Sequence, residues 1–153
     1  MKILVLSDIH GCSNTAQNIV AANENAKHII FLGDGMNSIK QMESFFPEKS
    51  FYCVAGNCDF ITATDENFLN IGGKNIFFTH GHKYYVKQRR DLAPLKERAK
   101  LLGAHIALFG HTHVPYKEQD GELYLMNPGA VLQSSYGVIE INDGEIELHL
   151  RYI

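Results

Sequence analysis

Five short segments of this sequence end in side chains that bind divalent metal ions. Each segment follows an apolar run, and in four of the five a glycine is the direct neighbour of the polar residue: Gly33, Gly56, Gly81 and Gly110. The polar side chains supply two carboxylates, one amide oxygen and four imidazoles. In chain order they are Asp8, His10, Asp34, Asn57, His80, His111 and His113.

Seven such donors are too many for one ion, but they suit two ions that share a bridging carboxylate. Imidazole and carboxylate donors without a thiolate favour Mn, Fe, Co, Ni or Zn over the all-oxygen sites of Ca and Mg. Each segment has a plainer reading when taken alone, because Asp-x-His is common and Gly-Asp and Gly-Asn are ordinary turn sequences. The metal prediction therefore depends on all five segments meeting in space.

The apolar runs predict strands at residues 3–7, 28–32, 51–55, 75–79 and 105–109. Helices are expected between several of them, from Ser13 or Asn14 to about Ala26, from Asn37 or Ser38 to Phe46, and from Asp91 to Leu102. Strands that alternate with helices favour parallel pairing. Because parallel strands end at one edge of a sheet, where open α/β sheets bind their ligands, this pattern predicts that the five segments converge.

The last third of the chain has a different pattern. Short strands are expected at 116–119, 122–126, 137–141 and 145–151, with hairpin turns at Asp120-Gly121 and Asn142-Asp143-Gly144. Apolar and polar residues alternate along the last two of these strands, which is typical of an antiparallel sheet with one wet face. The predicted fold is α/β, with two mixed β-sheets packed face to face as a sandwich and flanked by α-helices.

Composition narrows the classes of protein. The 153 residues predict one domain, 1–153, and a net charge of -3 argues against nucleic acid or an anionic membrane as an obligate partner. The cysteines, Cys12, Cys53 and Cys58, form no CxxC pair, so neither a disulfide framework nor a structural zinc site is expected. No run is long enough to span a bilayer and no signal peptide is recognisable, so the expected location is the cytoplasm.

Taken together, the segments resemble the five motifs of the calcineurin-like metallophosphoesterase superfamily. The short chain, Gly56-Asn57-Cys58-Asp59 and Asn127-Pro128-Gly129 are similar to its small single-domain phosphodiesterase branch. The resemblance implies a four-layer sandwich with two divalent metal ions. In that arrangement the first ion is held by Asp8, His10 and His113, the second by Asn57, His80 and His111, and Asp34 bridges both.

The resemblance also implies an activity, the hydrolysis of a phosphate ester by a hydroxide that bridges the two ions. Manganese is the favoured metal, with Ni, Co, Fe and Zn as alternatives. The implied catalytic residues are Asn57, Cys58, Asp59 and His82. Cys58 departs from the histidine that many members carry, and a thiol with a pKa of about 8.5 is a poorer proton donor at neutral pH than an imidazolium. Phosphodiesters are therefore favoured over monoesters, unless Cys58 is a packed small residue without a catalytic part.

Two other functions stay open. The same fold resembles a subunit of the retromer trafficking coat, which implies a protein-interaction scaffold, and the same ions suit a phosphomonoesterase or pyrophosphatase. The expected partner is a small-molecule or nucleotide-like phosphate ester, and a homo-oligomer is possible. His82 either contacts substrate or lies outside the ligand set. The basic residues Lys83, Lys87, Arg89 and Arg90 form either a phosphate-binding rim or a solvated helix face.

Overall fold

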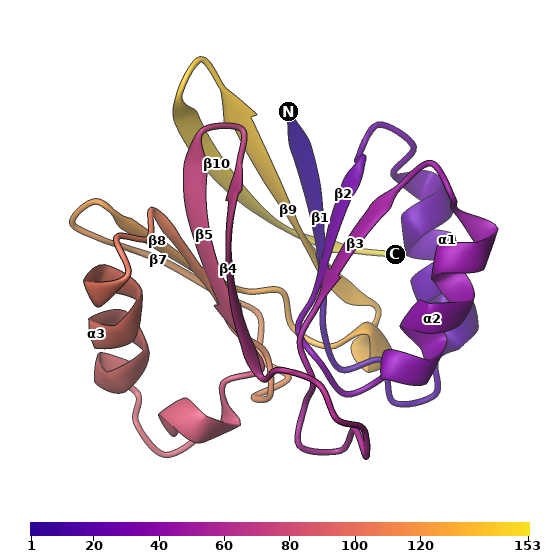
Figure 1. The fold of residues 1–153 in the computed structure, drawn as a ribbon, viewed down its shortest axis with the longest axis horizontal. Coiled ribbons are helices and arrows are strands. Elements are labelled where there is room, and N and C mark those ends of the chain that lie inside the picture. Colours follow the sequence, from indigo (N-terminus) through magenta and orange to yellow (C-terminus); the bar gives the residue numbers. More distant parts are fainter.

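The computed structural model describes residues 1–153 and contains two five-stranded sheets and three α-helices (Figure 1). The first sheet has the order β10-β9-β1-β2-β3, with the bounds Glu145–Tyr152, Ser135–Asn142, Lys2–Leu6, His28–Phe31 and Ser50–Cys53. The second has the order β4-β5-β6-β8-β7, with the bounds Glu66–Ile71, Lys74–Thr79, Ile106–Leu108, Leu123–Asn127 and Tyr116–Asp120.

The helices are α1 (Ser13–Ala22), α2 (Met36–Phe45) and α3 (Ala93–Leu101), and short 3-10 turns occupy His82–Tyr84 and Val131–Gln133. None of the three α-helices has the length and apolar character that a membrane crossing requires.

Both sheets combine parallel and antiparallel pairs. In the first sheet β1, β2 and β3 run parallel, while β9 and β10 are antiparallel additions beside β1. In the second sheet β5, β6 and β8 run parallel, and the edge strands β4 and β7 are antiparallel to their neighbours. The two mixed sheets confirm the predicted sandwich.

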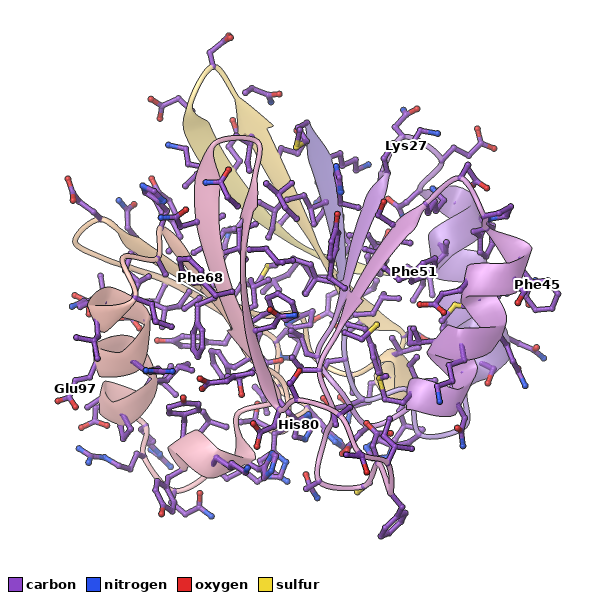
Figure 2. All side chains as sticks on the ribbon, in the orientation of Figure 1. Lys27, Phe45, Phe51, Phe68, His80 and Glu97 are labelled. Carbon is purple, nitrogen blue, oxygen red and sulfur yellow. The ribbon has the colours of Figure 1, made fainter.

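Alternating side chains divide the core into layers. On β1, Ile3 and Val5 pack between the two sheets, whereas Leu4 and Leu6 pack toward α1 and α2. A third apolar cluster lies between the second sheet and α3 and includes Leu95. The order of layers is therefore α1 and α2, first sheet, second sheet, α3, and side chains fill the space between the sheets (Figure 2).

One topological expectation was wrong. The strands that carry the metal-binding segments do not share one sheet edge, because β1, β2 and β3 belong to the first sheet and β5 and β6 to the second. Their C-terminal ends still meet, because the shared apolar cluster packs the two sheets face to face. The convergence is thus a property of the sandwich and not of one sheet.

Strand β4 was missed. Three of its six residues, Glu66–Ile71, are apolar but do not form a continuous run, and it pairs with β5 through a turn at Gly72-Gly73, where both glycines have positive φ. A Gly-Gly pair between strands is a hairpin signal in its own right.

Two helix ends also differ from the expectations. Helix α1 ends at Ala22 instead of about Ala26, because Asn23 Nδ2 donates to the Ile19 carbonyl at the helix end and Lys49 Nζ donates to the carbonyls of Asn23 and Ala26 in the segment that follows. Helix α2 begins at Met36, ahead of Asn37 and Ser38, because a carboxylate from another loop accepts its first amide protons.

Candidate metal centre

The ends of the two sheets bring the seven predicted metal-binding residues into one continuous network. His80 lies where the sheets approach each other at the lower side of Figure 2. Asp8 and His80 are fully buried and Asp34 is 4% exposed, so the carboxylates are removed from bulk water. Buried carboxylates need compensating charge or donors, which makes the surroundings of each oxygen informative.

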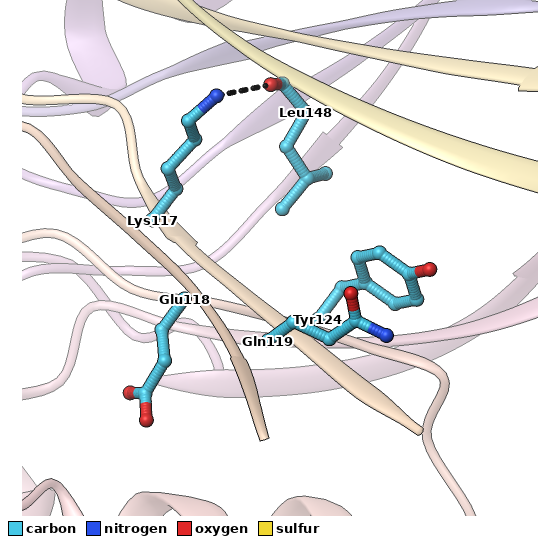
Figure 3. Close-up of a pocket in the computed structure, with 5 residues that line it drawn as sticks. All are labelled: Lys117, Glu118, Gln119, Tyr124 and Leu148. Atoms are coloured by element: carbon cyan, nitrogen blue, oxygen red, sulfur yellow. Dashed lines mark hydrogen bonds between the residues drawn. The ribbon is translucent and has the colours of Figure 1, made fainter. Parts of the chain in front are cut away.

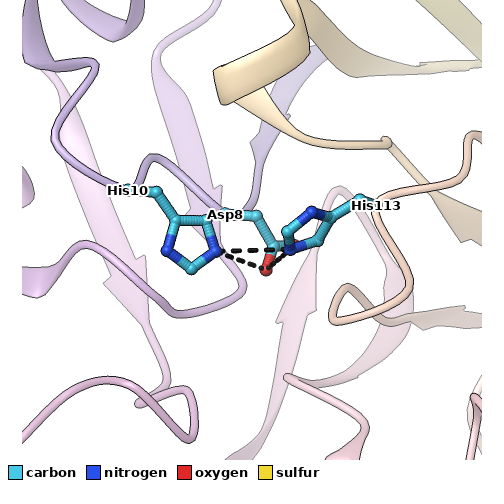
Figure 4. A group of neighbouring side chains, drawn as sticks. All are labelled: Asp8, His10 and His113. Carbon is cyan, nitrogen blue, oxygen red and sulfur yellow. Dashed lines mark hydrogen bonds and ion pairs between the residues drawn. The ribbon is translucent and has the colours of Figure 1, made fainter.

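Asp8, His10 and His113 form one half of the network (Figure 4). Asp8 Oδ1 lies 3.1 Å from His113 Nε2 and 3.6 Å from His10 Nε2, and the two Nε2 atoms are 3.3 Å apart. The second oxygen, Oδ2, accepts protons from Ser7 Oγ at 2.6 Å and from the His111 amide at 3.1 Å. These two donors fix the carboxylate and leave Oδ1 facing the two imidazoles.

His80 is the centre of the other half. Its Nδ1 lies 2.7 Å from the carbonyl oxygen of Leu32, and because a carbonyl only accepts, Nδ1 carries the proton. In the neutral ring Nε2 then presents a lone pair. That lone pair faces three further atoms that could donate a lone pair to a metal ion: Asp34 Oδ2 at 3.4 Å, Asn57 Oδ1 at 3.0 Å and His111 Nδ1 at 3.1 Å.

Asp34 lies between the two halves. Its Oδ2 is 3.6 Å from His10 Nε2 and 3.4 Å from His80 Nε2. Its Oδ1 accepts the amide proton of Cys58 at 2.8 Å. This is the place that a bridging carboxylate would occupy.

The donor set fits divalent cations. Lone pairs of imidazole, amide and carboxylate groups point at one another, and Asp8 Oδ1 is buried without a hydrogen-bond partner. Such an arrangement is unfavourable in a protein interior unless a cation accepts the lone pairs. The proton on His80 Nδ1 also sets the tautomer that metal-binding histidines adopt, with the second nitrogen bonded to a backbone carbonyl.

Backbone strain is concentrated at the same residues. Nine residues other than glycine have positive φ, and five of them belong to the predicted metal-binding set: Asp8, His10, Asp34, His111 and His113. This left-handed conformation costs about 1–2 kcal/mol per residue for most side chains. Local strain that persists in several neighbouring residues is typical of a functional site.

Two glycines permit the close approaches that form the centre. A Cβ atom on Gly56 would lie 2.0 Å from Asp34 Oδ1 and 2.6 Å from the Asp34 backbone nitrogen. A Cβ atom on Gly110 would lie 2.0 Å from Ser7 Oγ and 3.0 Å from Asp8 Oδ2. Gly110 therefore lets the end of β6 approach the end of β1, which joins the two sheets at the centre.

Asp59, a predicted catalytic residue, holds the backbone instead. Its Oδ1 accepts the amide protons of Gly35 and Met36, and its Oδ2 accepts those of Asp34 and Gly56, at 2.8–3.0 Å. Burial opposes ionisation of this carboxyl, but the four amide donors outweigh it and lower its pKa. With both oxygens occupied, Asp59 joins the loops that carry Asp34 and Asn57 and begins helix α2, and it is better described as a positioning residue than as a catalytic one.

Cys58 and His82 lie at the edge of the centre. The Cys58 thiol is exposed, and a possible ligand atom of this residue lies within 4.8 Å of ligand atoms of His10 and Asp34. The His82 ring is 5.4 Å from that of His80 and 6.1 Å from that of His111, measured between centroids, and its Nδ1 is buried without a partner. Cys58 adjoins the network, because its amide donates to Asp34 Oδ1 and its sulfur lies 3.5 Å from Asn57 Nδ2, whereas the His82 side chain makes no hydrogen bond to it.

Two imidazoles at the centre, those of His111 and His82, are held in the neutral state. Burial, together with the neighbouring His80 and Lys87, lowers the pKa of His111 to about 4. Burial and His80 also lower the pKa of His82. At neutral pH both rings therefore offer lone pairs without a prior loss of a proton.

Comparisons with known proteins define the class. Residues 1–144 match the family model described as the calcineurin-like phosphoesterase superfamily domain. The chain is 34% identical over 134 residues to the probable metallophosphoesterase YsnB of Bacillus subtilis, an alignment that covers 86% of this chain and 75% of that protein. The chain belongs to the calcineurin-like phosphoesterase superfamily and is a metallophosphoesterase.

Two further similarities are narrower. Phosphodiesterase YfcE of Escherichia coli is 28% identical over 171 residues, covering 92% of this chain and 88% of that protein. In fold, the chain matches the crystal structure of a predicted phosphoesterase from Streptococcus pneumoniae with a TM-score of 0.82 and 24% identity, covering 99% of this chain and 88% of the other.

Sequence reasoning missed two supporting groups. Ser7 fixes Asp8, and Asn127 Nδ2 donates to the carbonyl of Gly110 and to Thr112 Oγ1, both at 2.9 Å, which holds the turn that carries His111 and His113. The Asn127-Pro128-Gly129 segment had been noted only for its resemblance. A polar residue at the end of a buried strand was the available signal for both.

Proposed function

We propose that the chain is a metal-dependent phosphodiesterase with a dinuclear centre. The observation that carries the proposal is the continuous network in which Asp34 lies between two sets of donors whose lone pairs face one another. Two divalent ions bound there would lower the pKa of water and neutralise charge on the phosphoryl group. Manganese stays the favoured metal, and the cytoplasmic location, the single domain and the nucleotide-like substrate stay predictions.

Each group of the chain has a distinct task in this proposal. The carboxylates of Asp8 and Asp34 supply the negative charge that retains the ions, and the imidazoles and the Asn57 amide complete the coordination as neutral donors. Ser7, Asp59 and Asn127 hold these groups in place. The His82 ring lies beside His80 and His111, and we assign it a contact with a phosphate oxygen or the leaving oxygen of the substrate.

Cys58 bears on the choice of substrate. Partial desolvation of the largely exposed sulfur and the nearby Asp34 carboxylate raise the pKa of the thiol, so it stays protonated at neutral pH and gives up its proton reluctantly. Substrates whose leaving group needs a strong acid are then disfavoured. This supports a preference for diesters over simple alkyl monoesters.

The test is hydrolysis of bis(p-nitrophenyl) phosphate and of p-nitrophenyl phosphate by metal-stripped protein reloaded with Mn. We expect the diester to be cleaved faster, only with metal, and not by Asp34→Asn. Asp143→Asn is the matched control, because Asp143 lies exposed in the turn between β9 and β10 and its positive φ suits Asn. If neither ester is cleaved with any metal although ions still bind, the interaction scaffold becomes the better proposal, and preferred cleavage of the monoester would favour a phosphatase.

A further inference from the structure

A cleft with a volume of about 480 Å³ lies beside the metal centre, between the segments 86–92 and 109–116. Its lining is mostly apolar and includes Val86, Leu92, Phe109 and Val114. This volume is within the range of sites that enclose small organic ligands. None of its lining residues belongs to the seven predicted metal-binding residues.

Both walls of the cleft continue the turns that carry candidate metal ligands. Thr112, which lines the cleft, lies between His111 and His113. Gly81, between His80 and His82, packs on the other wall: a Cβ atom there would lie 3.0 Å from Val86 Cγ2 and 3.5 Å from Phe109 Cβ. A group bound in the cleft could therefore belong to the same molecule as a phosphate bound at the centre.

The cleft differs from the surrounding surface in how its basic side chains are paired. Of the basic side chains between residues 83 and 100, five are paired with carboxylates, namely Lys83, Arg89, Lys96, Arg98 and Lys100. Lys87 and Arg90 have no carboxylate partner, and Arg90 lines the cleft. An unpaired guanidinium beside an apolar surface favours a ligand that is both apolar and anionic.

A second hollow shows the contrast (Figure 3). It is lined by Lys117, Glu118, Gln119, Tyr124 and Leu148, and it includes no residue of the metal centre. Its only cation, Lys117 Nζ, donates to the carbonyl oxygen of Leu148 at 3.2 Å. Two of its five lining residues are hydrophobic, against five of seven in the first cleft, and it also contains the carboxylate of Glu118.

We propose that the cleft binds one ester group of the substrate, and that this group is an aromatic ring bearing a negative charge. The ring would contact Val114 and Tyr116, the exposed apolar residues of the lining, and its anionic substituent would pair with Arg90. The inference rests on the proposed phosphodiesterase function, because hydrolysis must break one P–O bond, give oxygen from water to phosphorus and a proton to the leaving alcohol. The other ester group stays on the phosphate, and we place this retained group in the cleft.

Three p-nitrophenyl diesters test the proposal, because they share the leaving group and differ only in the retained group: methyl, phenyl or 4-carboxyphenyl. We expect kcat/KM to rise about tenfold from methyl to phenyl, the size of effect that an apolar pocket gives. A further rise of about threefold is expected for 4-carboxyphenyl, as an exposed ion pair would give. Each ratio is corrected for the same ratio in alkaline hydrolysis without protein.

Two variants assign the effects. Arg90→Gln should remove the preference for the carboxylated ring, whereas the neighbouring Arg89→Gln should keep it, since Arg89 already pairs with Asp91 at 2.9 Å. Val114→Asn should lower the phenyl-to-methyl ratio, because it places an amide on the apolar wall. Equal corrected ratios for all three diesters in the wild-type protein would overturn the proposal, as would an unchanged carboxyl preference in Arg90→Gln.

A binding measurement keeps the cleft testable if no diester is cleaved. Benzoate and acetate are titrated into the metal-free protein while backbone amide NMR shifts are recorded. Benzoate, and not acetate, should shift amides of residues 86–92 and 109–116, and Arg90→Gln should weaken the effect at least about threefold. Failure of hydrolysis with this shift pattern intact would reject the proposed enzyme but keep the cleft, whereas absence of the shifts would reject the cleft.

Discussion

The two sheets contribute unlike chemistry to the metal centre. The first sheet supplies both carboxylates, Asp8 and Asp34, each fixed by hydrogen bonds from neighbouring backbone or hydroxyl groups. The second sheet supplies only imidazoles from its two central strand ends, and its His80 is oriented by a carbonyl of the first sheet. Both negative charges thus come from the first sheet, together with the neutral donors His10 and Asn57, whereas the second sheet supplies imidazoles alone.

This difference shows that neither sheet alone provides the candidate metal site. The first sheet brings two buried carboxylates together, which repel each other without a cation. The second sheet brings imidazoles together whose lone pairs lack protons to accept. Packing of the sheets at Gly110 places the neutral donors around the charged ones, and bound cations would satisfy both. The following predictions test that division, from the largest expected effect to the smallest.

Activity should be more sensitive to a carboxylate of the first sheet than to an imidazole of the second. We expect Asp8→Asn to lower kcat/KM for Mn-dependent diester hydrolysis by at least about a thousandfold, and His113→Asn by about a hundredfold, since each decade costs about 1.4 kcal/mol and loss of charge adds to loss of a ligand. Both are measured with saturating Mn, and calorimetry gives the Mn affinity. A loss for His113→Asn equal to or greater than that for Asp8→Asn would contradict the comparison.

The contact between the two sheets at Gly110 should have a large effect on the free energy of unfolding. Gly110→Ala is expected to lower the free energy of unfolding in urea by about 3 kcal/mol, because the added Cβ would overlap Ser7 Oγ at the junction of the sheets. Gly73→Ala is the control: it has positive φ but open space, so about 1 kcal/mol is expected. The double variant Ser7→Ala with Gly110→Ala should recover part of the loss, and no recovery would mean that the overlap is not the cause.

In the loops of the first sheet, Asp59 should contribute strongly to the stability of the fold. Asp59→Asn is expected to cost about 2–3 kcal/mol, because an amide cannot accept four backbone protons and lacks the charge that the start of α2 favours. The pKa of Asp59 is lowered on folding, so its contribution is present above the unfolded pKa and is lost as the pH falls through the folded value. Urea unfolding at pH 7 and at acid pH measures both, and Asp143→Asn should change stability by less than about 0.5 kcal/mol. Equal losses in the two variants would refute the role of Asp59.

The smallest effect concerns the choice of ester. Cys58→His places an imidazole at the edge of the centre, where it can protonate a leaving alkoxide. We expect the ratio of monoester to diester cleavage to rise about tenfold, below the full range for general acid catalysis because the site is not shaped for it. Cys58→Ser is the control and should leave the ratio unchanged. A ratio that does not respond to His would show that Cys58 faces the substrate without taking part in proton transfer.

The sequence determined the class of fold and predicted which residues form the candidate centre. Ligand-type residues at the ends of apolar runs can be recognised in the sequence, because a buried strand turns toward a ligand at its end. The alternation of apolar and polar residues in the last third predicted the antiparallel strands. The seven residues lie in one network for that reason. Strand β4 was missed because its three apolar residues are interrupted by polar ones and form no run of their own, although it pairs with β5 over its whole length.

The tertiary structure alone decided which donors face which. Segments that looked like one sheet edge came from two sheets, and only their packing placed Asp34 between His10 and His80. It also showed that Asp59 holds backbone amides, that five donors have left-handed backbone, and that Arg90 lacks a partner beside an apolar cleft. The physical reason is that strand and helix patterns depend on neighbours along the chain, whereas charge pairing, tautomers and close backbone approaches depend on groups that are distant in sequence and adjacent only in the folded state.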